Sequence, residues 1–299
     1  MVGRLQAQSG GRVGFVSDNG AGQERDWLRR GKYVRNALAE TWGALAEVCF
    51  DLSGREWAMP TECPGWDVKD QLSHLIGIEQ AIVGEPVPEW NEPLGEHVKN
   101  EFAATNERFV AVRRALPGAA VRAEFVEVTG TRLAQLDALT AAEWAETGWS
   151  PVGEVSRVEF MTVRVYDSWV HEQDVRLALD RPGGSGNTAS DISLDRVQGA
   201  MPYVVGKKAE CADGTAVRFV IAGPKDDARA FTIAVEDGRA RAIGDDVAPT
   251  VTLSLSSIDF VRLGCGRVTA AQVEAAGGVG VEGDARAAQA VLGAMNFMF

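Results

Sequence analysis

The stretch VRVYDSWVHEQDVRLAL, residues 163–179, decides the fold and carries the most informative polar residues of the chain. It contains no Gly or Pro, and its apolar residues recur at steps of three and four, which predicts one helix packed against a core. Asp167 and His171 stand four residues apart, so a helix places both side chains on one face, one turn apart. Asp174 continues this face. An acid and an imidazole in such a stripe need polar partners, because burying an unpaired polar group is costly.

A second histidine lies in another predicted helix, within MPTECPGWDVKDQLSHLIGIEQAIVG, residues 59–84. The Pro and Gly residues near its start predict a turn. Asp67 then has the character of an N-cap, and Asp70 stands three residues later, where a capping box has its acidic residue. A helix is predicted over residues 68–83, and His74 lies inside it among leucines and isoleucines.

If these two helices pack side by side in a bundle, His74, Asp167 and His171 converge. Two imidazoles and a carboxylate suit Zn²⁺ or a similar divalent ion, and three protein ligands leave a position open for chemistry. Asp174 would then accept the second ring N–H of His171. An alternative stays open from spacing alone. An Asp and a His four residues apart often form a surface pair, and a histidine in an apolar helix is often a core residue with its hydrogen bonds satisfied.

The first half of the chain is predicted to be helical. Residues 1–22 are rich in Gly, Ser and Gln without a sustained period, which predicts a flexible leader. Further amphipathic or helical patterns cover residues 24–50, 97–116 and 119–139. Long helices with short connectors favour an up-and-down four-helix bundle over residues 23–182.

The pattern changes after residues 183–192, a Gly- and Ser-rich linker by composition. Residues 193–299 are predicted to form a smaller α+β domain, in which short β-branched runs separated by turn residues alternate with helical segments. The predicted strands are residues 216–222, 231–235, 240–243, 250–255 and 279–282.

Composition limits the classes of partner. The net charge of -12 argues against nucleic acid or an anionic membrane surface, because both require a basic patch. No apolar run is long enough to span a bilayer, and the N-terminus lacks a secretory signal, so we expect a cytoplasmic protein. Its four cysteines are widely separated, which favours reduced thiols over a metal or disulfide framework. Nothing in the sequence indicates a protein partner.

Several stretches resemble the mycothiol-dependent maleylpyruvate isomerase family, a branch of the DinB-like metalloproteins. They are PTECPGWDVKDQLSHL at 60–75, VYDSWVHEQDVRLALDRPGG at 165–184, YVVGKKAE at 203–210, FVRLGCGR at 260–267 and the ending VEGDARAAQAVLGAMNF. The resemblance implies a DinB-like metal-binding four-helix bundle followed by a sterol-carrier-like domain. It places the metal ligands on His74, Asp167 and His171. The family has Glu where this chain has Asp167, so the metal would lie nearer this helix or bind more weakly.

The resemblance also implies the cofactors and the chemistry: a divalent metal such as Zn²⁺, and mycothiol, the small thiol of actinobacteria. A metal with an open position would hold the thiol as a thiolate for attack on a small electrophile. With a cis-enedione acid the outcome is cis–trans isomerisation, and with a substrate that carries a leaving group it is S-transfer. Two other classes stay open: a metal-dependent hydrolase using metal-bound water, and a non-enzymatic carrier of apolar ligands.

Two arginines near the sequence LGCGR are candidate catalytic residues. Arg262 and Arg267 would hold a substrate carboxylate by a two-point contact, although both would also be ordinary as surface residues. Cys265 between them is a second possible nucleophile, but a small buried residue is the simpler interpretation. Trp66 and Trp169 flank the proposed ligands in sequence and are expected in the bundle core or the pocket wall.

Overall fold

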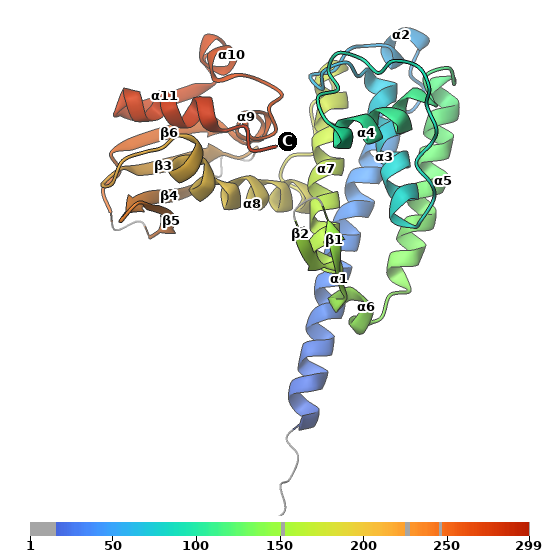
Figure 1. Cartoon of the computed structure of the whole chain (residues 1–299), viewed down its shortest axis with the longest axis horizontal. Coiled ribbons are helices and arrows are strands. Elements are labelled where there is room, and N and C mark those ends of the chain that lie inside the picture. Colours follow the sequence, from blue (N-terminus) through green and yellow to red (C-terminus); the bar gives the residue numbers. More distant parts are fainter. Residues whose placement is uncertain (1–15, 151–152, 225–227, 245–246, 299) are drawn as a thin grey trace, which may run out of the picture.

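The computed structural model describes residues 16–150, 153–224, 228–244 and 247–298. It consists of a helical part and a sheet with helices packed against it, joined by one long helix, α8 (Thr188–Tyr203) (Figure 1). This arrangement confirms the predicted fold class, a helical bundle followed by a smaller α+β domain. None of the described helices is long and apolar enough to cross a membrane. The four cysteines are free thiols.

Four long helices form the bundle: α1 (Val16–Val48), α3 (Val68–Ile82), α5 (Gly118–Asp137) and α7 (Arg157–Ala178). Helices α5 and α7 each pack against both α1 and α3, so α1 and α3 occupy opposite corners. The direct packing of α3 on α7 matters for function, because it brings the histidine of one helix opposite the Asp–His pair of the other.

The helix boundaries follow from local capping. Helix α7 begins six residues before the predicted start at Val163, because Ser156 caps it and Glu159 closes a capping box. Helix α3 matches its prediction, with Asp67 as N-cap and Asp70 in the capping box.

Short elements connect the bundle helices, and several were not predicted. They are α2 (Gly54–Trp57), α4 (Glu101–Ala111), α6 (Ala141–Ala145) and a hairpin of β1 (Thr147–Ser150) and β2 (Gly153–Ser156). The helix predicted over residues 97–116 is shorter in the structure: it is α4, which begins after its N-cap, Asn100. The segment interpreted as a loop, residues 144–152, contains the end of α6 and strand β1.

The predicted boundaries of the leader and of the linker also differ from those in the structure. The predicted leader, residues 1–22, lies mainly outside the described residues, and its end forms part of α1, which starts at Val16. Helix α8 begins inside the predicted linker 183–192, because the Asn187 side chain accepts a hydrogen bond from the Ser190 N–H and so caps a helix there.

The second domain contains a five-stranded sheet in the order β5-β4-β3-β6-β7, in which only β3 and β6 pair in parallel. The predicted strands are all present: β3 (Ala216–Ala222), β4 (Ala228–Glu236), β5 (Arg239–Ile243), β6 (Val251–Ser256) and β7 (Val279–Gly283).

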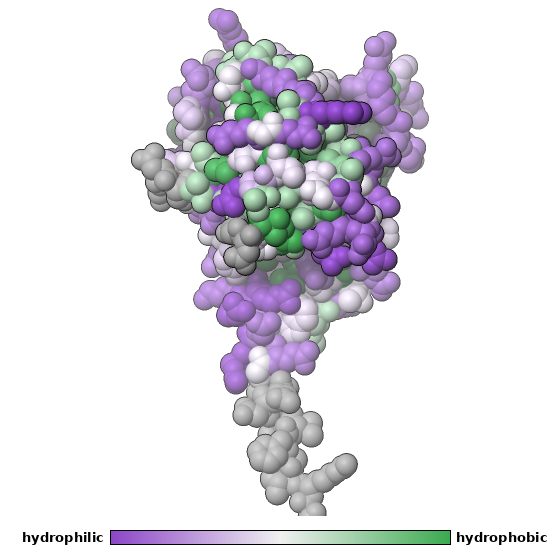
Figure 2. All heavy atoms as spheres, turned by 90° about the vertical axis from the view of Figure 1, so that its left-hand side faces the viewer, coloured by the Kyte–Doolittle hydropathy of each residue, from purple (hydrophilic) through white to green (hydrophobic). Residues whose placement is uncertain are grey.

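Helices complete this domain: a π-helical turn, η1 (Val204–Lys208), then α9 (Ser257–Gly264), α10 (Ala270–Ala275) and α11 (Ala285–Ala294). Alternate residues of β3 and β6 are buried, so the sheet has one core face. Phe219, Phe231 and Phe260 gather there, with the first two rings stacked 4.9 Å apart. The outward side of this domain is largely hydrophilic, with small hydrophobic patches (Figure 2).

Candidate metal centre

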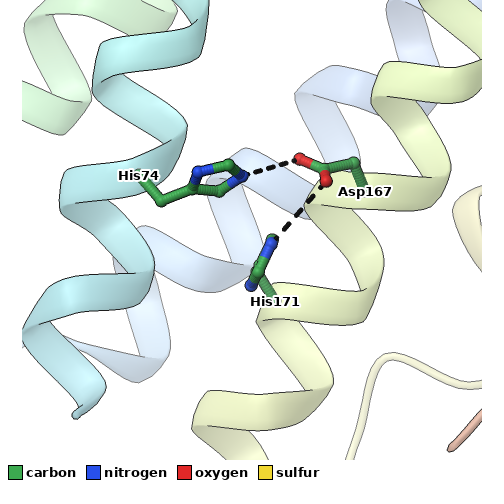
Figure 3. A group of neighbouring side chains, drawn as sticks. All are labelled: His74, Asp167 and His171. Carbon is green, nitrogen blue, oxygen red and sulfur yellow. Dashed lines mark ion pairs between the residues drawn. The ribbon is translucent and has the colours of Figure 1, made fainter. Parts of the chain in front are cut away.

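The structure brings the three predicted donors together at the contact of α3 and α7 (Figure 3). His74 Nε2 lies 3.4 Å from Asp167 Oδ2, and His171 Nε2 lies 3.7 Å from Asp167 Oδ1. The imidazole centroids are 4.7 Å apart. One donor atom from each residue falls within 4.8 Å of the others. Ligands of a tetrahedral ion with bonds of about 2.0–2.2 Å are separated by about 3.3–3.6 Å, so this spacing suits a zinc-sized ion.

The unmet hydrogen bonds of His74 support this fit. Both its ring nitrogens are buried, and neither makes a well-aligned hydrogen bond within the described part of the chain, although Nε2 lies 3.4 Å from Asp167 Oδ2. A buried polar atom left in this way is costly unless something else binds it, and a cation would accept its lone pair. Burial also lowers the pKa of His74 to about 4, against the opposing effect of Asp167, so the ring is neutral near pH 7.

The other two donors complement that neutral ring. Burial opposes ionisation of Asp167, but the Arg164 guanidinium and the two imidazoles outweigh it and hold the pKa of this carboxyl well below its usual range. Burial likewise disfavours the charged form of His171, yet Asp167 and Asp174 raise its pKa above the ordinary value. The Asp167 side chain keeps 24% of its surface exposed, whereas both histidines are buried. The cluster therefore offers one ionised carboxylate and two imidazoles, with access from the Asp167 side.

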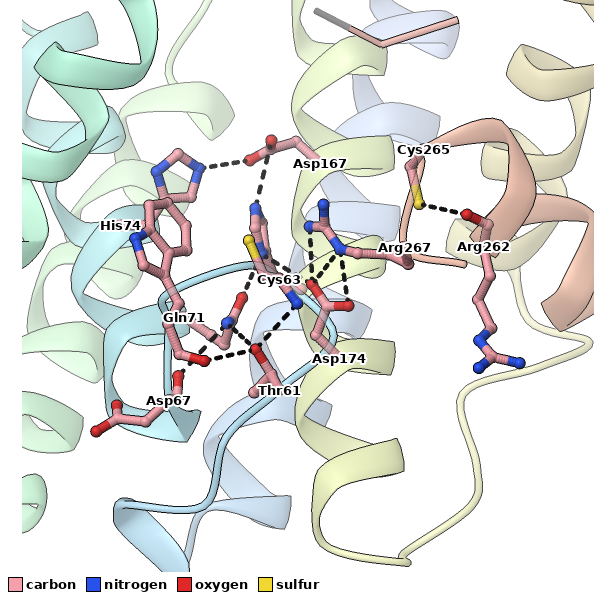
Figure 4. Close-up of polar contacts among 12 residues, drawn as sticks. Thr61, Cys63, Asp67, Gln71, His74, Asp167, Asp174, Arg262, Cys265 and Arg267 are labelled. Atoms are coloured by element: carbon pink, nitrogen blue, oxygen red, sulfur yellow. Dashed lines mark hydrogen bonds and ion pairs between the residues drawn. The ribbon is translucent and has the colours of Figure 1, made fainter. Parts of the chain in front are cut away.

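Gln71 and Asp174 orient His171 (Figure 4). The ring Nδ1–H donates to Gln71 Oε1 at 2.5 Å, and Asp174 Oδ2 lies 3.4 Å from the same nitrogen. The Gln71 amide is itself fixed, because its Nε2 donates to Thr61 Oγ1 at 2.8 Å. With Nδ1 as the donor, the Nε2 lone pair faces the cluster, as metal ligation requires. Asp174 thus lies where the sequence predicted; Gln71, three residues before His74, was missed.

A buried ion network holds Asp167 from the other side. Arg164 Nη1 donates to Asp167 Oδ2 at 2.6 Å, and its Nε donates to Glu79 Oε1 at 2.8 Å. Arg132 Nε donates to the second oxygen of Glu79 at 3.0 Å. This network was not predicted from the sequence, although the three-residue step from Arg164 to Asp167 was a usable signal.

Trp66 forms a wall of the centre. Its ring lies 5.0 Å from His74 and 5.9 Å from His171, centroid to centroid, and its Nε1 donates to Glu107 Oε2 at 2.8 Å. His97 Nε2 contacts the same Glu107 oxygen at 2.8 Å, so the third histidine supports Trp66 and is not one of the grouped donors. Trp169 instead donates to the Gly184 carbonyl and belongs to the core.

The two arginines proposed for substrate binding have carboxylate partners inside the chain. Arg267 contacts both oxygens of Asp174 at 2.9–3.1 Å. Arg262 binds Glu62 and Asp259, and its guanidinium points away from the cluster (Figure 4). The ion pairs Arg267–Asp174 and Arg262–Glu62 join the α+β domain to the bundle. A direct substrate role for either arginine stays a prediction, one that these ion pairs disfavour.

Neither nearby thiol has the character of a nucleophile. Burial raises the pKa of Cys265 to about 11 and that of Cys63 to about 12, in both cases against the effect of Arg267. The thiolate is the reactive form, so both groups are unreactive near neutral pH. Neither thiol is therefore a candidate nucleophile for this centre.

Two family models match the chain. Residues 38–176 match the model described as the mycothiol maleylpyruvate isomerase N-terminal domain, and residues 204–296 match the SCP-2 sterol transfer family. The first range contains all three donors.

Solved structures similar to the chain include two forms of mycothiol-dependent maleylpyruvate isomerase, one of them a mutant. They are 17% and 16% identical, each with a TM-score of 0.46 over 86% of this chain and 92% of that chain. Sterol carrier protein 2 from Yarrowia lipolytica is 18% identical, with a TM-score of 0.28 over 36% of this chain and 88% of that chain. No curated protein matches the chain.

Proposed function

Since the helical part belongs to the mycothiol maleylpyruvate isomerase N-terminal domain family and the second part to the SCP-2 sterol transfer family, we propose that this chain is a zinc-dependent enzyme that uses mycothiol. Its reaction is the attack of the activated thiol on a small electrophile. We place it in the cytoplasm, where thiols remain reduced.

One observation carries the proposal: two imidazoles and an ionised carboxylate converge on a point that remains accessible from the Asp167 side. His74, Asp167 and His171 would hold a divalent ion, which when bound supplies the Lewis acidity that lowers the pKa of a thiol. The chain's own groups prepare this site. Gln71 and Asp174 fix the tautomer of His171, Arg164 holds Asp167, and the Trp66 ring covers the imidazoles.

Two reactions follow from thiol activation. In cis–trans isomerisation of an activated double bond the thiol is returned unchanged. In S-transfer the thiol is consumed: its sulfur bonds to a substrate carbon while the substrate's leaving group departs from that carbon with its bonding electrons. The local geometry favours neither, because both need the same nucleophile at the same point.

A comparison of thiols against electrophiles tests the proposal. Zinc-loaded protein is incubated with maleylpyruvate, maleate, dimethyl maleate or monobromobimane, each with mycothiol, glutathione or no thiol. Turnover only with mycothiol supports the proposal, and the product separates isomerase from transferase. Turnover without any thiol would instead indicate a hydrolase. A bound lipid with no turnover of any electrophile, unaffected by His74→Ala, would indicate a carrier.

A further inference from the structure

Arg196 on α8 is a semi-buried guanidinium without a counter-ion. Within the described ranges, no carboxylate lies at ion-pair distance from it, and its Nε is buried without a hydrogen-bond partner. Among the described residues, Arg196 lies over the face of Tyr166, with 5.5 Å from the guanidinium carbon to the ring centroid. Burial lowers the pKa of Arg196, but an arginine remains charged at neutral pH. A charge in this setting calls for an anion.

Arg196 lines a cavity of about 650 Å³ between α1, α7 and α8, closed in part by Phe297. Among the other charged groups of the lining, Arg29 and Asp195 have ion-pair partners, whereas Arg30 lies against an aromatic ring and adds its own positive charge. Arg29 pairs with Asp26 at 2.6 Å, and Asp195 pairs with Arg229. Arg30 stacks on Trp27, 4.6 Å from its ring. The cavity therefore carries a net positive charge.

The remaining wall is mostly apolar, formed by Val34, Val158, Ile192 and Ala200. An apolar body with an anionic end matches these surroundings, because the guanidinium would bind a carboxylate at two points while the aliphatic side chains cover the carbon skeleton.

Tyr166 connects Arg196 to the helix that carries two of the three donors. This residue precedes Asp167 on α7, is 1% exposed, and has a hydroxyl with no hydrogen-bond partner among the described residues. Asp167 is also near enough to favour the charged form of Arg196. Arg196 is therefore within electrostatic reach of Asp167, although neither Tyr166 nor any of the three donors lines the cavity itself.

We propose that Arg196 binds the carboxylate of a small organic acid in this cavity, and that this acid is the electrophilic substrate of the metal centre on α3 and α7. The second clause rests on the function proposed above. The assignment replaces Arg262 and Arg267 as carboxylate-binding groups, since their charges are matched within the chain whereas the charge of Arg196 is not.

Calorimetric titration of the zinc-free protein with maleate tests the first clause, with dimethyl maleate as the neutral analogue. Removing zinc prevents the acid from binding the metal instead. We expect maleate to bind wild type, to bind Arg196→Gln about 10- to 100-fold more weakly, and to bind Arg196→Lys with intermediate affinity. Arg29→Gln is the matched control, because it changes an exposed, paired arginine of the same cavity. Equal maleate affinity in wild type and Arg196→Gln would overturn the inference.

A second variant keeps the inference testable if Arg196→Gln fails to fold. Gly199 lines the cavity from α8, and a Cβ added there meets no atom within 4 Å. Gly199→Leu raises helix propensity and narrows the cavity while leaving Arg196 in place. We expect it to weaken maleate binding at least tenfold with thermal unfolding unchanged or raised. Unchanged binding in this variant would also contradict the inference.

Kinetics separate this inference from the proposed function. With zinc and mycothiol supplied, Arg196→Gln should raise KM for maleate at least tenfold and leave kcat/KM for dimethyl maleate unchanged. If maleate binds through Arg196 but wild type turns over no electrophile, the cavity stands and the proposed function fails. If dimethyl maleate is turned over but maleate binds wild type and Arg196→Gln with equal affinity, the proposed function is supported and the inference about Arg196 is wrong.

Discussion

The guanidinium of Arg267, in the α+β domain, contacts both oxygens of Asp174, on bundle helix α7, through Nε and Nη2. Asp174 in turn lies 3.4 Å from His171 Nδ1. Burial works against the charge of Asp174, but Arg267 and His171 keep its pKa below the ordinary value. The second domain therefore takes part in orienting a candidate metal ligand of the first.

Removing the Asp174 charge should weaken the metal site without removing a ligand. In Asp174→Asn, His171 keeps Gln71 but loses its carboxylate neighbour, and zinc affinity should fall about 10- to 100-fold. Competition with a chromophoric chelator measures the affinity. Asp259→Asn is the control, because Asp259 pairs with Arg262 away from the cluster. Equal zinc affinity in both variants would show that Asp174 has no orienting role.

Removing a ligand should abolish metal binding. His171→Ala leaves one imidazole and one carboxylate, too few donors for a tetrahedral site, so purified protein should lose its zinc. Elemental analysis of the purified variant provides the measurement. His97→Ala, which removes the histidine bound to Glu107, should retain wild-type zinc content. Unchanged zinc in His171→Ala would mean that the ligands are wrongly assigned.

Zinc affinity should fall on acidification as His171 is protonated first and His74 only at lower pH. The pKa of His171 is raised, mainly because Asp167 outweighs the effect of burial, so below that pKa a proton must leave before zinc binds. The affinity should therefore fall about tenfold per pH unit on acidification. The pKa of His74 is lowered to about 4 by burial, so it adds a second proton only as the pH approaches that value. Two protons released together near pH 6 would contradict this order.

The sequence predicted the bundle helices and all five strands of the second domain because each has a clear period or β-branched run. It missed the β1–β2 hairpin, where the residues TGWS and GEVS carry no alternation that could distinguish strands from a loop. Helix starts shifted wherever a polar cap lay beyond the apolar pattern, as at Ser156 and Asn187.

The shared face of Asp167 and His171 was predictable from their four-residue step, whereas the meeting with His74 depended on the packing of α3 against α7. The supporting residues were not predictable. Glu79 reaches Arg132 and Arg164 only because α5 and α7 both pack on α3, a choice that no local pattern encodes. The assignment of Arg262 and Arg267 to a substrate could not account for carboxylates 200 and 93 residues away that neutralise them.

Glu79 should be essential to the stability of the bundle. Its side chain is fully buried, with one oxygen bound to Arg164 and the other to Arg132. In Glu79→Gln the amide has only one acceptor oxygen and no charge, so at least one buried guanidinium loses its counter-ion. Removing one partner of a buried ion pair costs about 3–5 kcal/mol, which corresponds to a fall in Tm of roughly 6–20 °C.

The comparison variant is Glu101→Gln, which breaks the exposed pair between Glu101 and Arg108. It should cost at most about 1 kcal/mol, because such pairs are solvated in both states. Thermal unfolding of both zinc-free variants separates stability from metal binding. Zinc affinity measured afterwards should also fall in Glu79→Gln, since Arg164 would no longer be held against Asp167. If the two variants unfold at the same temperature, Glu79 does not anchor the network, and the position of Asp167 must be set by the helix backbone alone.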